Sequence, residues 1–471
     1  MSKTNVIVVL DIGKTNLKIC ALALSDATQL AVLKRPNGVL QQAPYPQLDI
    51  EGIWHWYCEN IKDLAQRFAI SKLAFTTHGA TAVCLSGNEL ALEVLDYESD
   101  LCCKADQQYN LQRPSYAQSL SPALGAGLNL GRQLHWQQQQ FSDQFSTVDC
   151  ILMYPQYWGW RMSGIKASEV TSLGCHTDLW NPQQQIFSSL VDNMGWRKLF
   201  PALLPTGQSL GPVLPALAKQ LGLSPDCQVI NGIHDSNASL VPYIKQAPSP
   251  CTVISTGTWV VIAAIGSPLT ALLESQDMLA NVSAFGESVP CIRFMGGREW
   301  QVLSTESPAS LDDLNLIMQS GIQALPCFSE QGGPFSRLKG EFIGPTEQLN
   351  DNQRSALASL YCAFVTHYCL DLVQGKQPGN IYIEGSFARN SIYLNLLQQL
   401  NPQQKVLVSE DSTGTTLGTG LCVGDCEWQV KLPNTGVPVL QLETQPLEYY
   451  QIWLNLVLTH RDGSKSEDIR R

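Results

Sequence analysis

Charge is scarce in this 471-residue chain, and positive charge is the scarcer sign. Charged residues make up 15% of the sequence, with 30 Lys and Arg against 41 Asp and Glu, so the formal net charge is −11. No basic run interrupts this balance, which disfavours binding to nucleic acid or to an anionic membrane surface. No apolar run approaches the roughly 18 residues of a membrane span. The apolar stretch before Asp11 is too short for a signal peptide, so we expect a cytoplasmic protein.

The fifteen cysteines include no Cys-x-x-Cys pair, and most stand singly within apolar stretches. This pattern excludes a zinc knuckle and favours reduced thiols that act as small hydrophobic residues. Hydrophobic residues make up 44% of the chain, which is typical of a well-folded protein rather than a disordered one. The length predicts two to three domains.

The most informative stretch is an apolar run, 6–10, followed by Asp11, a polar turn and a second apolar run, 17–24. Gly13 has no Cβ, so its backbone can approach an anion closely. The amides and hydroxyl of the turn 13–16 can donate hydrogen bonds to phosphate oxygens. The turn is not a Walker A loop, because Val8 stands where that pattern needs its first glycine. An ordinary hairpin with a polar turn is the alternative.

The same arrangement recurs after a Pro-rich linker at 245–250. Residues 251–255 predict a strand, 256–258 a small polar turn and 259–264 a second strand. We therefore expect an internal duplication with two similar domains, 1–246 and 247–471, that face each other across a cleft. Further predicted elements are a helix over 52–68, strands at 72–77 and 227–230, a helix over 236–244, a long amphipathic helix over 351–373, strands at 381–383 and 406–408, and helices over 391–400, 413–423 and 448–453. The Gln-rich tract within 104–147 is expected to be a solvated helix or loop.

Four stretches, in this order, resemble motifs of the FGGY carbohydrate kinases, within the actin-like, sugar-kinase and Hsp70 fold group. Residues 11–16 (Asp-Ile-Gly-Lys-Thr-Asn) resemble the first phosphate motif, and 232–235 (Gly-Ile-His-Asp) the segment with the catalytic aspartate. Residues 255–259 (Ser-Thr-Gly-Thr-Trp) resemble the second phosphate motif, and 384–390 (Glu-Gly-Ser-Phe-Ala-Arg-Asn) the adenosine motif. The second and third stretches are most similar to the rhamnulose and fuculose kinase branch. The first differs from most well-studied members and indicates a separate subgroup.

The resemblance implies an α/β fold with two actin-like, ribonuclease-H-like domains facing across a nucleotide- and sugar-binding cleft. It implies transfer of the γ-phosphate of ATP to a hydroxyl of a small sugar, a ketose of the rhamnulose, fuculose or xylulose type. The expected ATP-binding residues are Gly13, Lys14, Thr15, Asn16, Thr256, Gly257, Thr258, Gly385, Ser386 and Asn390. Asp11 is expected to orient Mg²⁺ through water, because magnesium keeps several of its waters. Ser386 replaces the second glycine of the adenosine motif, so we expect looser nucleotide packing.

Asp235 is the predicted catalytic base, since it follows a predicted strand and begins a predicted helix that would hold it ionised. A plain helix N-cap is the alternative. The expected sugar-binding residues are His78, Gly79, Asp96, Trp158, His234 and Asp235. The alternatives for these are a strand-end histidine for His78, a core aromatic for Trp158 and a solvated turn for Asp96.

Two other functions remain open at this point. An actin- or Hsp70-like ATPase would share the fold, so the fold alone does not decide. A sugar-binding pseudokinase with a regulatory role is the other, although the retained Asp11, Thr15, Asp235 and Gly257 argue against it. The sequence does not identify the sugar, and it leaves the oligomeric state open, with a homodimer as one option.

Overall fold

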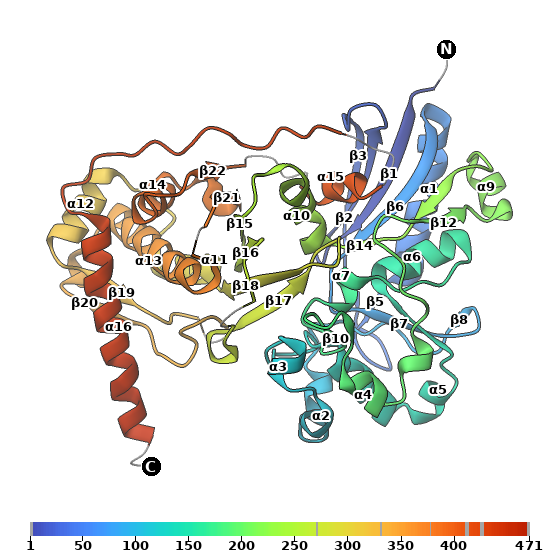
Figure 1. Ribbon diagram of the computed structural model, residues 1–471, viewed down its shortest axis with the longest axis horizontal. Helices are drawn as coiled ribbons and strands as arrows, with labels where there is room; N and C mark the ends of the chain where they lie inside the picture. The colour runs from blue at the N-terminus through green and yellow to red at the C-terminus, as the bar shows by residue number, and fades with distance from the viewer. Residues whose placement is uncertain are drawn as a thin grey trace. The chain divides into compact units, whose positions relative to one another are not determined.

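The computed structural model describes residues 3–269, 272–329, 332–376, 378–409, 414–423 and 428–468 (Figure 1). The chain divides into two compact units. Unit 1 contains residues 1–246, 280–288 and 413–430, and unit 2 contains 247–279, 289–412 and 431–471. Unit 1 therefore includes two later segments that the sequence analysis assigned to the second domain.

Unit 1 is built on a mixed sheet with the strand order β12-β13-β6-β1-β2-β3, and β14 also pairs with β6. The hairpin of β1 (Asn5–Ile12) and β2 (Asn16–Ala23) is antiparallel, while β6 (Ala69–Thr77) runs parallel to β1. The other strands are β3 (Gln29–Pro36), β12 (Ser209–Pro212), β13 (Gln228–Ile230) and β14 (Ile233–His234). The predicted strands at 6–10, 17–24, 72–77 and 227–230 are thus confirmed.

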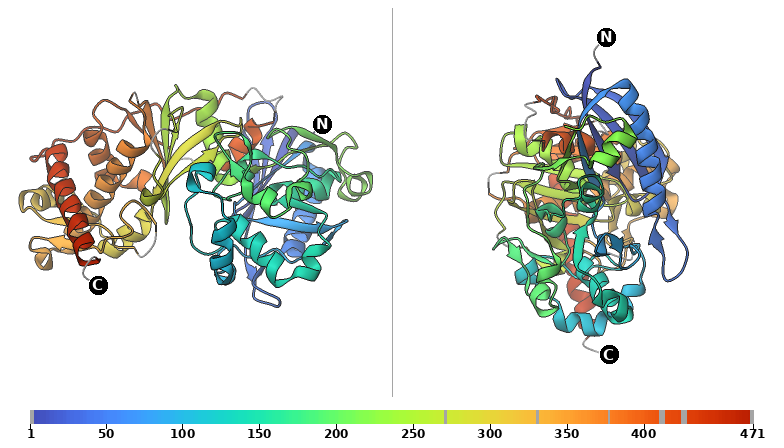
Figure 2. Two further views of the ribbon diagram at one scale, coloured as in Figure 1. Left: turned by 60° about the horizontal axis from the view of Figure 1, so that its bottom comes forward. Right: turned by 90° about the vertical axis from the view of Figure 1, so that its right-hand side faces the viewer.

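Helices cover both faces of this sheet because strand side chains alternate between the faces. Val6, Val8 and Leu10 pack in the cluster that contains residues of α1 (Ile50–Arg67). Ile7 and Val9 pack in the cluster that contains residues of α10 (Asp235–Gln246) and α15 (Gly414–Leu421). Figure 2 shows α1 lying along its face of the sheet.

Unit 2 repeats this pattern, with the strand order β17-β18-β16-β15-β21-β22. The hairpin of β15 (Cys251–Thr256) and β16 (Val260–Ile265) is antiparallel, and β21 (Asn380–Gly385) runs parallel to β15. The remaining strands are β17 (Met278–Val282), β18 (Ser288–Phe294) and β22 (Val406–Val408). In both units the first hairpin strand lies between its partner and a parallel strand. The expected duplication of the strand–turn–strand element is confirmed.

The long helix α13 (Asp351–Val373) differs from the sequence-based prediction. Ser355 to His367 are buried without interruption, so the helix is not amphipathic but forms the centre of the unit 2 core. Within the described residues it is the one helix long and apolar enough to cross a membrane, and 83% of its most apolar window is buried inside the protein. Ser, Thr and His interrupt its apolar residues, so it contains no continuous apolar run of that length.

The C-terminal part contains the predicted packing helix, α16 (Pro446–Asp468). Tyr449 donates a hydrogen bond to the carbonyl of Ile322, and the Trp453 indole donates to that of Ala324. Figure 2 shows α16, in red, beside the helices of unit 2.

The Gln-rich tract is solvated only in part, since Gln139 and Gln140 are exposed but the residues before them are not. It forms α4 (Leu130–Gln140), in which Leu130 to Gln137 are all buried. Gln137 donates to the Tyr45 hydroxyl at 3.1 Å, and Gln138 accepts from the Trp196 indole at 2.9 Å. Long amides that satisfy buried polar groups explain why a helix so rich in glutamine is packed rather than exposed.

The remaining elements of unit 1 are β4 (Val39–Leu40), β5 (Gln47–Leu48), β7 (Ala82–Ser86), β8 (Glu89–Leu90), η1 (Leu101–Ala105), α2 (Asp106–Gln112), α3 (Tyr116–Ser119), α5 (Ser142–Ser146), β9 (Cys150–Met153), α6 (Tyr154–Ser163), α7 (Val170–Leu173), β10 (Trp180–Asn181), β11 (Ile186–Phe187), α8 (Ser189–Asn193), η2 (Arg197–Leu199) and α9 (Pro215–Leu221). Those of unit 2 are η3 (Glu274–Gln276), α11 (Gly296–Leu303), α12 (Leu311–Gln319), β19 (Gln323–Leu325), β20 (Glu341–Ile343), η4 (Thr346–Gln348), η5 (Ser386–Arg389) and α14 (Ser391–Leu400).

Candidate functional site

Polar residues gather in unit 1 where three parallel strands end. Asp11 is level with Thr76 in the β1–β6 pairing, and His234 is level with Thr77 in the β14–β6 pairing. His78 directly follows β6, and its amide donates to the carbonyl of Ile12 at 2.8 Å. The carboxyl ends of parallel strands form the edge where open α/β sheets bind ligands.

Asp235 begins α10 at this edge. Its carboxylate accepts hydrogen bonds from the amide of Ser236 at 2.6 Å and from the Ser236 hydroxyl at 3.3 Å. The side chain is 27% exposed, so a ligand can reach it. Loss of solvation raises the pKa of Asp235 to about 6, although the bonds from Ser236 oppose the rise. The group is ionised at neutral pH and is more basic than an ordinary aspartate.

Two buried histidines flank this carboxylate. Nε2 of His234 lies 3.2 Å from Oδ1 of Asp235, and a Cβ added to Gly79 would meet Nε2 of His234 at 2.6 Å. Burial lowers the pKa of His78 and of His234 to about 4, so both rings are neutral at pH 7. His234 can therefore donate a hydrogen bond to Asp235 without adding a positive charge to the site.

His78 presents an unused acceptor. Its Nδ1 lies 3.1 Å from the carbonyl of Gly79, which can only accept, so Nδ1 carries the proton and Nε2 is bare. The residue is 5% exposed, and Nε2 has no hydrogen-bond partner among the residues that the structure describes. A buried acceptor without a partner is costly unless a ligand hydroxyl satisfies it.

The two lysines of the first hairpin are paired with carboxylates. Lys14 forms an ion pair with Asp96 and lies 4.8 Å from the ring centroid of Tyr97, whose ring in turn contacts His78. Lys18 pairs with Asp11 at 3.1 Å. Desolvation raises the pKa of Asp11, the positive charge of Lys18 lowers it, and the negative charge of Asp235 raises it. Both lysine side chains are therefore largely buried and held by carboxylates.

Trp158 is corrected from a sugar-stacking residue to a core residue. It is 0% exposed and packs with Trp54, Tyr154 and Tyr157, because its helix faces the sheet. Tyr154 lies between it and His78, so the indole is one layer behind the polar residues. Sequence reasoning instead missed Tyr97, whose only signal was its place beside Asp96.

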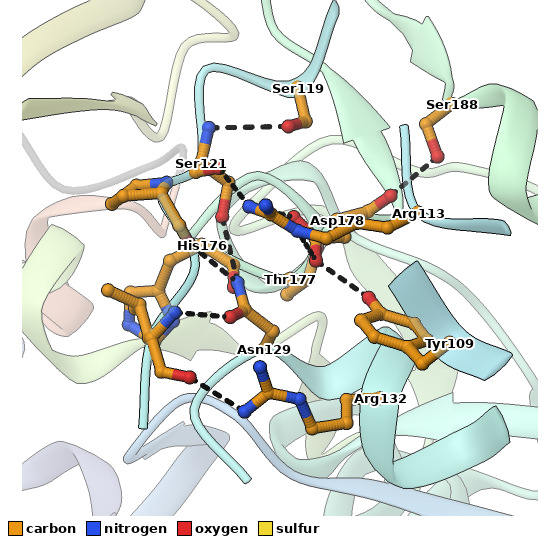
Figure 3. Close-up of polar contacts among 12 residues, drawn as sticks. Tyr109, Arg113, Ser119, Ser121, Asn129, Arg132, His176, Thr177, Asp178 and Ser188 are labelled. Carbon is orange, nitrogen blue, oxygen red and sulfur yellow. Dashed lines mark hydrogen bonds and ion pairs between the residues drawn. The ribbon is translucent and has the colours of Figure 1, made fainter. Parts of the chain in front are cut away.

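A buried polar network in unit 1 links the ends of α2 and α4 with the segment around Asp178 (Figure 3). Asp178 accepts from the Tyr109 hydroxyl at 2.6 Å and from Nε of Arg113 at 2.9 Å. Asn129 accepts from the amide of Leu124 at 2.8 Å. Figure 3 shows these side chains converging on the chain near Ser121, which fixes the loop that follows it. These bonds fix the residues around Ser121 in place.

Gln133 connects that loop to the histidine. Its side-chain amide donates to the carbonyls of Ala80 at 2.7 Å and of Gly127 at 2.5 Å. The amide of Gly127 donates to the carbonyl of Tyr97 at 2.8 Å. One buried glutamine therefore couples the turn after His78 with the residue that packs against His78.

Unit 2 contains a cavity of about 610 Å³. Four of the expected ATP-binding residues line it, namely Gly257, Thr258, Ser386 and Asn390. Further lining residues, which the sequence analysis did not identify, are Gly297, Trp300, Gln301, Glu306, Ser307, Pro308, Ala309, Ser355, Ser359, Phe387, Arg389, Ser391 and Ile392. The size and the mixed polar and apolar lining suit a ligand of nucleotide dimensions.

Thr256 and Gly385 lie behind the lining and join its parts. The hydroxyl of Thr256 donates to the carbonyl of Glu384 and accepts from the amide of Phe387 at 2.9 Å. A Cβ on Gly385, whose φ is +87°, would lie 1.9 Å from the carbonyl oxygen of Thr256. These two expected ATP-binding residues thus fix the turn that presents Ser386 and Phe387, rather than lining the cavity.

The buried Glu299, to which the sequence analysis gave no role, holds α11 against α13. Its carboxylate accepts from the Tyr361 hydroxyl and from the Ser329 hydroxyl at 2.8 Å. The amide of Arg298 donates to the carbonyl of Thr258 at 3.4 Å, so the start of α11 lies against the β15–β16 turn. The partners of Glu299 come from two segments that are distant in the sequence, so its role could not be predicted from sequence spacing.

Gly418 permits a close helix crossing in unit 1. A Cβ there would lie 1.8 Å from the carbonyl of Ala238, so it allows α15 to cross α10 within unit 1. Across the described parts of the chain, no group of three His, Cys, Asp or Glu side chains could hold a metal ion. The cysteines described there are all free.

Comparison with known proteins gives the family. Residues 6–242 match the N-terminal domain of the FGGY family of carbohydrate kinases, and residues 248–431 match the FGGY carbohydrate kinase C-terminal domain. A carbohydrate kinase from Novosphingobium aromaticivorans, of known crystal structure, is 32% identical, with a TM-score of 0.90 over 98% of this chain and 99% of that one. The L-fuculokinase of Escherichia coli K12 is 24% identical, with 89% of this chain and 92% of the relative covered. The xylulose kinase of Lactobacillus acidophilus shares the fold at 16% identity, with a TM-score of 0.80 over 98% of each chain.

The first matched domain alone spans half of the chain, and the 32% identical structure extends over nearly all of it. Membership of one family explains the two matched domains, and it also explains the duplicated hairpins and the two sets of polar residues. This chain belongs to the FGGY family of carbohydrate kinases, enzymes that transfer a phosphoryl group from ATP to a sugar.

Proposed function

We propose that this chain phosphorylates a hydroxyl of a small ketose, with Asp235 as the catalytic base. The observation that carries the proposal is the environment of Asp235. It is a part-exposed carboxylate at the carboxyl edge of a parallel sheet, with a pKa raised to about 6 and a neutral histidine 3.2 Å away. A base is most effective when its pKa lies near the working pH.

Asp235 would orient the attacking hydroxyl and accept its proton as the bond to phosphorus forms. His234 would hold the carboxylate, and the bare Nε2 of His78 would accept a hydrogen bond from a second sugar hydroxyl. The cavity in unit 2 would hold the nucleotide, with Gly257 and Thr258 at its phosphates. The protein's contribution to such a transfer is alignment and charge stabilisation rather than covalent chemistry.

Asp11 suits a magnesium ion held through water. It is one carboxylate whose charge also acts on Asp235, and magnesium commonly uses one or two carboxylates together with substrate phosphates. The chemistry supplied by the ion would be neutralisation of phosphate charge. Lys18, 3.1 Å from Asp11, keeps that carboxylate compensated before the nucleotide arrives.

The sugar class follows from the relatives whose names state a substrate. They are named L-fuculokinase and xylulose kinase, so we propose a ketose of five or six carbons. A coupled assay of ADP release over ketoses, aldoses and polyols tests this. We expect one ketose to raise ADP release far above the sugar-free rate. Release that is indifferent to every sugar would instead support a partner-regulated ATPase.

The pH profile should show the raised pKa of Asp235. Because the base must be ionised, kcat/KM should fall about tenfold for each pH unit below about 6 and level off above it. A terminal phosphate also titrates near pH 6. Asp235→Asn provides the control. The fall of its residual kcat/KM at low pH should reflect only the phosphate titration, because the variant has no carboxyl group at position 235. An identical acid limb in both proteins would contradict the assignment.

His78→Phe should raise KM for the sugar about tenfold, because the ring is kept and one acceptor is lost. KM for ATP should stay within twofold, since His78 belongs to unit 1 and the cavity to unit 2. Steady-state kinetics with each substrate varied in turn measure both values. His55→Ala, an exposed histidine on α1, is the matched control. An equal rise in both KM values would mean that the variant damages the fold rather than the sugar contact.

A further inference from the structure

One hydroxyl in the unit 2 cavity has nothing to bond. Ser355, on α13, lines the cavity and is 2% exposed, yet its Oγ has no hydrogen-bond partner within the described chain. Leaving a buried hydroxyl unpaired costs free energy. A ligand atom in the cavity would satisfy it.

The Ser355 hydroxyl also lacks the hydrogen bond that a helical serine usually makes within its own helix. A serine inside a helix commonly donates to the carbonyl four residues earlier, and Ser359 does so, to the carbonyl of Ser355 at 2.8 Å. The corresponding carbonyl for Ser355 is that of Asp351, which already accepts from the Thr305 hydroxyl at 2.8 Å. The usual intrahelical bond of Ser355 is thus replaced by a bond from another segment.

Ser359 provides the contrast, because its hydroxyl is fully used. It accepts from the side-chain amide of Asn390 at 2.8 Å and from the Trp300 indole at 3.3 Å, besides donating within the helix. Of two serines one turn apart on the same cavity wall, one organises the wall and the other remains free for a ligand.

The position of Ser355 identifies the part of the nucleotide it meets. The helices α11 and α13 are antiparallel. Gly296, at the start of α11, contacts Cys362, and Thr305, just after its end, contacts Asp351 at the start of α13. Ser355 lies about 10 Å along α13 from Cys362, at the rise of an α-helix. It is therefore far from the start of α11, towards the other end of the cavity.

The start of α11 is the phosphate end. A Cβ on Gly297 would lie 2.0 Å from the carbonyl oxygen of Gly257, so this glycine packs directly on the β15–β16 turn. With phosphates at Gly257 and Thr258, a nucleotide in the cavity extends along α11 and brings its base to the opposite end, where Ser355 and the loop 306–309 lie.

We propose that Ser355 is a binding residue that hydrogen-bonds the base of a nucleotide in the unit 2 cavity. This inference rests on the proposed function in taking the ligand to be a nucleotide whose phosphates lie at Gly257 and Thr258. The hydroxyl can donate or accept, so it pairs with a base edge in either sense.

The test measures ADP binding to the full chain by titration calorimetry, without sugar. Ser355→Ala should bind ADP about three- to tenfold more weakly than the wild type, the effect of one neutral hydrogen bond. Ser355→Thr, which keeps a hydroxyl, should restore most of the affinity. The melting temperature of Ser355→Ala without nucleotide should be unchanged or higher, since an unpaired hydroxyl has been removed. A lower melting temperature together with weaker binding would overturn the inference, because it would indicate a structural role.

Deoxy nucleotides distinguish a contact with the base from a contact with the ribose. The loss in Ser355→Ala should be the same for 2′-deoxy-ADP and 3′-deoxy-ADP as for ADP, because the base is common to all three. A loss that disappears with either deoxy nucleotide would assign Ser355 to the ribose and overturn the base contact. Equal ADP affinity in wild type and Ser355→Ala would also overturn it. The ADP titration involves neither sugar nor turnover. A negative result in the ketose assay or with Asp235→Asn would therefore not affect the measured ADP affinity, and the two proposals can fail independently.

Discussion

Replacing Asp235 with asparagine should lower kcat by about 10³-fold, because a positioned general base typically contributes 10²–10⁴-fold. Asparagine keeps the shape of the side chain and can still accept one hydrogen bond from Ser236. It cannot take the proton of the attacking hydroxyl. KM for the sugar and for ATP should change much less than kcat. The measurement is ADP release with the ketose found in the substrate screen.

The stability of the Asp235→Asn variant separates lost chemistry from lost folding. Burial raises the pKa of Asp235 above its ordinary value, so folding favours the neutral form of this group. Above pH 6 the ionised carboxylate therefore reduces the free energy of unfolding, and asparagine removes that cost. The variant should melt at or above the wild-type temperature. Turnover within tenfold of wild type would refute Asp235 as the base.

Replacing Gly385 with alanine should abolish measurable ADP binding and destabilise unit 2. The residue has φ +87° and ψ −148°, a region that is almost confined to glycine. The added Cβ would also lie 1.9 Å from a backbone oxygen, that of Thr256, so no side-chain rotation relieves the clash. Strain and displacement together should cost more than about 3 kcal/mol, a large fraction of the stability of a domain.

Denaturant unfolding and ADP calorimetry measure the two effects of Gly385→Ala. Gly436→Ala is the matched control in unit 2, because a Cβ there would meet nothing within 4 Å and its φ is not in the left-handed region. The control should keep the wild-type stability and ADP affinity. A Gly385→Ala protein with wild-type values would mean that the turn presenting Ser386 and Phe387 does not need this glycine.

Strand ends and hairpins could be predicted because their signals are local. Asp11, the turn after it and the His234–Asp235 pair each follow an apolar strand, and the same pattern at 251–264 revealed the duplication. Parallel pairing then brings the ends of β1, β6 and β14 to one edge without further information from the sequence.

Residues that depend on packing between distant segments could not be predicted. The sequence predicted that Trp158 stacks on the sugar, but the position of its helix makes it a core residue. Glu299 and Ser355 gain their roles from the contact between α11 and α13, which lie far apart in the sequence. Gln133 was hidden in a tract whose composition suggests solvent, because composition does not show which amides face buried carbonyls.

The chain order and the domain order of this protein do not coincide. The face of α10 in unit 1 is covered by α15, and the Trp428 indole donates to the carbonyl of Leu24 at 2.9 Å, so residues beyond 413 complete the layer begun before 246. During synthesis on the ribosome, the first domain to start is therefore finished only after most of the second has emerged. A fragment that stops at Gln246 would keep its strands but leave an apolar helix surface bare, which makes it prone to aggregate.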